Sequence, residues 1–143
     1  MADWTRDTPW RQGSLVARDD LRAIGVSVEE QHVCGLVISH DCDLANDRLD
    51  HEPWVELVLL EPLGKLDPNL TYGKNPRRLH FQIGNASEDV ECYEAHARTR
   101  LMLHKTDLAP LSRCRAGLPM PSTWIYCVVG WLADIAGRRC PMP

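Results

Sequence analysis

The sequence predicts a single, mainly β domain: a small, partly open β-barrel of about five strands with an amphipathic helix at its C-terminal end. Three observations predict this class. The 143 residues are 44% hydrophobic and 25% charged, as in one soluble globular domain. Proline, glycine and asparagine divide the chain into short segments, which is typical of β-rich domains. Only the last segment has the spacing of an extended amphipathic helix.

Three strands are predicted in the first half of the chain, after an N-terminal arm formed by residues 1–12. The segment WRQGSLVARDDL begins with a turn at Gly13 and continues as a short strand. His32–Ser39 is almost continuously apolar, which indicates a strand covered on both faces. Glu52–Leu63 combines β-branched and aromatic side chains with prolines near both ends, which indicates a third strand.

Two further strands are predicted in the second half. Residues 77–83 alternate polar and apolar side chains with a period of two, as a half-buried strand does. Residues 90–104 fit either a strand or a helix, and the length of the alternation favours the strand. One face of that strand is small or apolar, formed by Tyr93, Ala95, Ala97, Thr99, Leu101 and Leu103. The other face is polar, formed by Cys92, Glu94, His96, Arg98 and Arg100.

The last predicted element is a helix over residues 121–137. Apolar side chains recur at helical spacing from Trp124 to Ile135, Ser122 can serve as the N-cap, and Gly137 is a suitable stop. We expect this helix to pack on the sheet. Curling so few strands towards a barrel is the simplest way to protect their edges.

Composition limits the location and the class of partner. The chain has no signal-peptide pattern and no apolar run of about 18 residues, so we expect a soluble, cytoplasmic protein. Its six cysteines are expected to be reduced thiols, with metal binding and catalysis as special cases. The net charge is −4, but residues 1–72 carry −8 and residues 73–143 carry +4. The second half could therefore face an anionic partner, or the two halves could complement each other within one domain.

A candidate site follows the second predicted strand, in GLVISHDCDLAND. Four side chains there can bind metal, transfer protons or attack an electrophile: His40, Asp41, Cys42 and Asp43. If the strand continues, His40 and Cys42 lie on one side and could share a zinc ion with Cys92 and His96. This zinc site requires residues 92–96 to be helical, because in a strand the outer two Cα atoms lie about 13 Å apart.

Other interpretations of the same segment stay open. Cys42 could be a nucleophile whose base is one of three histidines, His40, His80 or His96. The aspartates could instead form a divalent-metal nuclease site with Glu56 and Lys65. In a purely structural interpretation, Asp43 and Asn46 cap a turn and Cys42 is a small buried residue.

Basic side chains form a second candidate site. If the strands over residues 77–83 and 90–104 pair, they bring arginines together with His80 and His96 on a surface that suits an anion or a phosphate backbone. The residues of this predicted surface are Arg77, Arg78, Arg98, Arg100 and Lys105. The alternative is a solvated outer face in which Glu91 and Glu94 are interleaved with the arginines.

The order Gly13-Ser14-Leu15-Val16, then GLVISHD, then WVELVLLEPL resembles the opening of the PemK/MazF toxin family over residues 10–63. This resemblance implies an SH3-like barrel and an RNA-cleaving or partner-binding surface. The chain departs from the family where a catalytic arginine precedes the second strand, because Gln31, His32 and Val33 occupy those positions. No catalytic residue is therefore transferred from the family.

Most of the chain is also similar to bacterial proteins that share a VISHDCDLAN-type motif, the segment found here at Lys105–Pro110, and a final helix. This similarity implies no particular activity. Such proteins continue past the helix into a further tail, which the composition of ADIAGRRCPMP could encode in another reading frame. We therefore expect residues 134–143 to be a truncated or frameshifted tail.

These patterns together predict a small cytoplasmic binding module. Its partner would be a protein or a nucleic acid in a bacterial accessory system, such as toxin–antitoxin, phage defence or its inhibition. The alternative is a hydrolase or nuclease that uses His40, Asp41, Cys42 and Asp43, with zinc as the cofactor under consideration.

Overall fold

A computed structural model describes residues 3–71, 75–83 and 91–114. Within them, six antiparallel strands form one sheet in the order β4-β5-β3-β2-β1-β6. The edge strands β4 and β6 are separated by the other four strands, so the sheet is open. The predicted mainly β, partly open fold is therefore confirmed. The predicted helix over residues 121–137 and the predicted tail lie outside the described residues.

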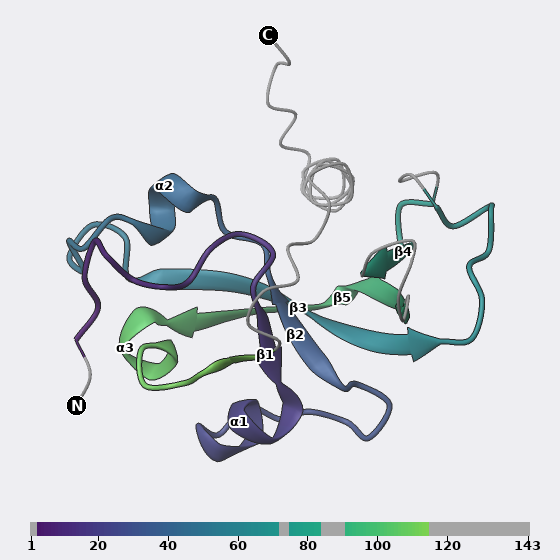
Figure 1. The fold of residues 1–143 in the computed structure, drawn as a ribbon, viewed down its shortest axis with the longest axis horizontal. Coiled ribbons are helices and arrows are strands. Elements are labelled where there is room, and N and C mark those ends of the chain that lie inside the picture. The colour runs from purple at the N-terminus through teal and green to yellow at the C-terminus, as the bar shows by residue number, and fades with distance from the viewer. Residues whose placement is uncertain (1–2, 72–74, 84–90, 115–143) are drawn as a thin grey trace, which may run out of the picture.

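The strands match the five predicted segments and add one short edge strand. Their bounds are β1 Leu15–Ala17, β2 Cys34–Val37, β3 Trp54–Leu63, β4 Arg78–Ile83, β5 Glu91–His104 and β6 Arg113–Cys114. Three short helices connect them: α1 Arg18–Ala23, α2 Asp41–Leu44 and α3 Lys105–Leu108. Figure 1 shows α2 and α3 at one end of the sheet and β4 at the other. Residues 91–104 are thus a strand, as the alternation predicted.

The sheet buries apolar side chains on both faces. Face A is built from strand residues and their immediate continuation, and consists of Leu15, Cys34, Leu36, Ile38, Val58, Leu60, Leu79, Phe81, Tyr93 and Ala95. Face B is covered by the N-terminal arm and the helices, and includes Trp4, Trp10, Val16, Leu21, Val37, Leu44, Val55, Leu57, Leu59, Leu103 and Leu108. The near-continuous apolar composition of β2 follows from this burial on both sides.

Strand β5 contains a large bulge at residues 96–99. Its pairing with β3 passes from Leu60 opposite Ala95 to Val58 opposite Arg100, so two steps on β3 match five on β5. Because the difference is odd, the alternation reverses across the bulge. The side chain of Ala95 therefore packs on face A, whereas that of Leu103 packs on face B. The prediction that residues 93–103 share one apolar face is therefore wrong, because it assumed an unbroken strand.

The chain turns sharply after β2, and the strand does not continue to Cys42. The carbonyl of His40 accepts the backbone N–H groups of Asp43 and Leu44, both at 3.0 Å, and α2 begins at Asp41. The carboxylate of Asp41 accepts the N–H of Gln12 at 2.7 Å, which ties this turn to the N-terminal arm. The predicted alternation of His40 and Cys42 against the aspartates therefore does not apply.

Gly35 provides a test of the packing between α1 and the sheet. A methyl group at this position would lie 3.2 Å from Leu21 Cδ1 and 3.3 Å from Leu57 Cδ2. We expect Gly35→Ala to lower the free energy of unfolding by about 1 kcal/mol, because both leucines must shift within a packed layer. Gly64→Ala is the control, since nothing lies within 4 Å of the added carbon. Urea denaturation that gives equal stabilities for the two variants would contradict this packing.

Candidate binding site at the β5 bulge

A cavity of about 700 Å³ lies on face B beside the β5 bulge. Its walls are the segment Val26–His32 on one side and strands β3 and β5 on the other, and the strands contribute Leu59, Glu61, Glu94, His96, Arg98, Thr99, Arg100 and Leu101. The Thr99 hydroxyl lies 2.8 Å from the carbonyl oxygen of His96 and 3.2 Å from that of Leu59, so it stabilises the bulge by donating to one of them. Bulges often redirect side chains towards binding sites. The size falls in the range of ligand sites, and the lining mixes charged with apolar groups.

Three arginines surround His96, which is half-buried at the edge of this cavity. Burial lowers the pKa of His96, and the positive charges of Arg98, Arg78 and Arg77 lower it further, against the opposing charge of Glu94. The imidazole is therefore neutral at pH 7. Its Nδ1 atom accepts the backbone N–H of Arg98 at 3.3 Å. We call Arg77, Arg78 and Arg98 the arginine cluster.

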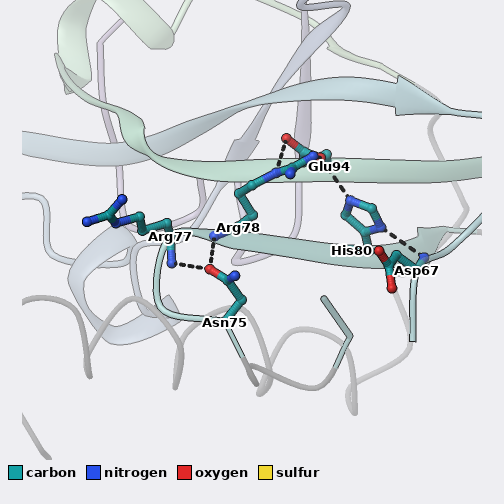
Figure 2. Close-up of polar contacts among 6 residues, drawn as sticks. All are labelled: Asp67, Asn75, Arg77, Arg78, His80 and Glu94. Atoms are coloured by element: carbon teal, nitrogen blue, oxygen red, sulfur yellow. Dashed lines mark hydrogen bonds and ion pairs between the residues drawn. The ribbon is translucent and has the colours of Figure 1, made fainter. Parts of the chain in front are cut away.

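Arg78 is exposed and forms a polar network with two buried residues, Glu94 and His80 (Figure 2). Arg78 donates from Nε to Glu94 Oε1 at 3.0 Å and from Nη2 to Glu94 Oε2 at 2.6 Å. His80 Nε2 lies 2.8 Å from Glu94 Oε2, and His80 Nδ1 accepts the backbone N–H of Asp67 at 3.0 Å. Since Nδ1 accepts, the proton is on Nε2, and His80 is a neutral donor to Glu94. Pairing between β4 and β5 places His80 directly opposite Glu94.

This network fixes the charge of Glu94. Burial would raise the pKa of Glu94, but the hydrogen bonds from Arg78 and His80 and the positive charge of Arg78 hold the pKa below its ordinary value of 4.5. The carboxylate is therefore ionised at neutral pH. Both ring nitrogens of His80 are engaged, so this histidine orients Glu94 and is not available as a base for Cys42.

Arg77 and Arg98 are the members of the cluster that can meet a partner. Both are exposed, and within the described residues neither guanidinium has a carboxylate partner. The Asn75 side chain accepts the backbone N–H of Arg77 at 2.8 Å and that of Arg78 at 3.2 Å, which fixes the turn into β4. Figure 2 shows the Arg77 side chain extending away from the network.

Two residues of the predicted basic surface are already engaged within the protein. Arg100 lines the cavity, but it follows the bulge, is opposite Val58 on face A and forms an ion pair with Glu56. Lys105 is fully buried, and its Nζ donates to the carbonyl oxygens of Asp43 at 2.6 Å and Asn46 at 2.9 Å. Both predictions are corrected for physical reasons. The bulge turns Arg100 to the opposite face, and Lys105 serves as an internal donor for backbone carbonyls.

The segment His40–Asp43 lies at α2, and its four side chains are exposed. The interpretation of Cys42 as a buried residue is therefore wrong, whereas Cys34 in β2 is buried. The backbone of α2 and the turn after it are held by buried donors: Lys105 donates to the carbonyls of Asp43 and Asn46, and Trp4 Nε1 donates to the carbonyl of Leu44 at 2.8 Å. The structure thus gives this segment a structural role, joined to Lys105 of the Lys-Thr-Asp-Leu-Ala-Pro segment.

The two halves of the predicted zinc site are far apart. The first half, His40 and Cys42, follows Ile38, whose N–H donates to the carbonyl of Glu56 near the start of β3. The second half begins at Cys92, which is opposite Leu63 at the other end of β3. Seven residues of strand separate Glu56 from Leu63, which corresponds to about 23 Å. Among the residues that the structure describes, no three histidine, cysteine or carboxylate side chains are placed to hold one metal ion. The proposed partner of Asp41 and Asp43, Glu56, is bound to Arg100.

Several cavity residues had not been singled out from the sequence, most notably Glu61, Leu59 and Gln31. One signal could have drawn attention to Glu61: it interrupts an apolar run in β3. The bulge has no comparable sequence signature, since residues 96–99 contain neither glycine nor proline.

No protein-family model and no curated protein sequence matches the chain. The helices that the structure describes are too short to cross a lipid bilayer. The function is therefore argued from the geometry of the site.

Proposed function

We propose that the chain is a binding module for a protein partner that presents acidic side chains to the arginine cluster. Consistent with the sequence, such a partner would belong to a bacterial accessory system. One observation carries the proposal: Arg98 lines a cavity together with His96, and the paired strands β4 and β5 place Arg78 directly opposite that histidine, with Arg77 next to it. Guanidinium groups are suited to binding carboxylates through two parallel hydrogen bonds.

A protein fits this surface better than a nucleic acid. The cluster offers two guanidiniums that have no carboxylate partner within the described residues, since Arg78 is already bound to Glu94. Glu29 and Glu61 line the same cavity and would repel a continuous phosphate backbone. Nucleic-acid binders usually neutralise more phosphates than two arginines can reach. A short acidic segment needs only the local positive charge.

Binding also fits better than catalysis at His40–Asp43. Those side chains are exposed on α2, and none of them lines the cavity. Asp41 is used to hold the N-terminal arm. A nucleophilic cysteine needs a base within hydrogen-bond reach, and His80 is committed to Glu94 and to the backbone of Asp67.

The test is a fluorescence-anisotropy titration with two labelled probes, an acidic peptide of alternating Asp and Glu and a single-stranded oligonucleotide of equal charge. We expect the peptide to bind, and Arg98→Glu or Arg77→Glu to weaken it about five- to thirtyfold, because attraction becomes repulsion at an exposed pair. Arg6→Glu is the matched control, an exposed arginine in the N-terminal arm. Cys42→Ala should bind as the unchanged chain does.

Two results would contradict the proposal. Tight oligonucleotide binding with a steep loss of affinity as salt rises would indicate a nucleic-acid partner. Equal effects of Arg6→Glu and Arg98→Glu would show that binding follows net charge and not the arginine cluster.

A further inference from the structure

We propose that the cavity accepts a segment of the partner in which an acidic and a basic residue stand two positions apart. The acidic residue pairs with Arg98, and the basic residue reaches Glu61 with its aliphatic stem on Leu59. This inference rests on the proposed function, because it names the chemistry of the partner at the same site.

Glu61 supplies the negative end of the cavity. It is opposite Glu94 in the pairing of β3 with β5, so two carboxylates share one face. The Glu94 carboxylate forms an ion pair with Arg78 and accepts a hydrogen bond from His80. Glu61 is half-buried, and no ion pair engages it within residues 3–71, 75–83 and 91–114. The charges of Glu94 and Glu61 both stabilise the Arg78 guanidinium, but its hydrogen bonds go to Glu94, so Glu61 can still accept an ammonium or guanidinium group.

Arg98 supplies the positive end, and the strand geometry sets the spacing. The bulge that carries Arg98 faces Leu59, and Glu61 is two residues further along β3. Leu59 and Glu61 are therefore about 6.6 Å apart along β3, and this offset sets the distance along the sheet between the bulge and the Glu61 carboxylate. An extended peptide has the same repeat, so alternate side chains can reach both charges at once.

The floor between the two charges is apolar. Leu59 is buried, and Leu101 and Val26 line the cavity beside it. The methylene groups of a lysine or arginine pack on such a surface while the charged head remains free to pair. Opposite charges at the two ends and an apolar floor together select a zwitterionic segment over a purely acidic one.

The experiment uses blocked pentapeptides with the core sequences Glu-Ala-Lys and Lys-Ala-Glu, to cover both chain directions, and the matched core Glu-Ala-Gln. Dissociation constants come from chemical-shift changes in ¹⁵N–¹H correlation spectra of the full chain. We expect one of the two lysine-containing peptides to bind at least fivefold tighter than Glu-Ala-Gln. Glu61→Gln should abolish this preference without weakening the binding of Glu-Ala-Gln, because that peptide has no basic residue for Glu61 to bind and the variant removes a repulsive charge. Arg98→Gln should weaken all three peptides.

The outcomes separate this inference from the proposed function. If all three peptides bind equally and Arg98→Gln weakens them, the acidic-partner proposal stands and the role of Glu61 is overturned. If Glu61→Gln leaves a lysine preference intact, the basic residue binds elsewhere and the inference again fails. If no peptide shifts any resonance of the cavity, both proposals are overturned.

Discussion

Lys105→Met is expected to lower the free energy of unfolding by about 2–4 kcal/mol at neutral pH. The fully buried ammonium donates to the carbonyl oxygens of Asp43 and Asn46, and each hydrogen bond to a charged group contributes about 1.5–3 kcal/mol. Burial lowers the pKa of Lys105, against the nearby charges of Glu52, Asp43 and Asp47, so part of that contribution is offset by desolvation. Urea denaturation measures the loss.

The control for this variant is Lys65→Met, which changes an exposed lysine in a loop. The free energy of unfolding of Lys65→Met should stay within about 0.5 kcal/mol of that of the unchanged chain. Hydrogen exchange gives a local readout, because the amides of Asp43 to Asn46 should exchange faster only when Lys105 is replaced. A stability loss below about 0.5 kcal/mol for Lys105→Met would show that the buried amine does not hold α2.

Glu94→Gln is expected to destabilise the fold by about 1.5–3 kcal/mol. The amide cannot accept both hydrogen bonds from Arg78 and also the one from His80, so a buried donor loses its acceptor. Glu56→Gln is the matched control. Like Glu94, Glu56 forms an ion pair with an arginine, here Arg100 of β5, but the side chain of Glu56 on face A is more exposed than that of Glu94. Its loss should not exceed about 1 kcal/mol. Equal losses for the two variants would contradict the buried network.

The Glu94 prediction has a pH dependence of known sign. Because the folded-state pKa lies below 4.5, the network contributes fully above that pH and is lost as the pH falls through the folded pKa. The stability difference between the unchanged chain and Glu94→Gln should therefore be constant near neutrality and narrow below about pH 4.5. A difference that grows on acidification would show that the pKa of Glu94 is raised.

Local patterns in the sequence predicted most of the fold. Alternation identified β4 and β5, and the apolar runs identified β2 and β3, because burial on one or two faces leaves a direct trace in residue order. The short helices were missed because four to six residues carry too little periodicity. The helix α2 in particular depends on contacts with distant residues, including Gln12 and Lys105.

The candidate site was predicted only in part. The pairing of β4 with β5 brings Arg78 together with His80 and His96, as the alternation required. Arg100 was placed on the wrong face because the bulge reverses the alternation, and no residue type marks that bulge. The sequence predicts Lys105 as a surface cation. It cannot show that the ammonium group is buried and donates to two backbone carbonyls.

The central claim is that the partner binds at the arginine cluster beside the β5 bulge. The most direct test follows the arginine Nε–H resonances in ¹⁵N–¹H spectra while a blocked triglutamate peptide is added to the full chain. The account predicts saturable shifts for Arg98 and Arg77, with Arg6 unchanged. Shifts confined to α2 around Cys42, or no arginine shift at all, would contradict it.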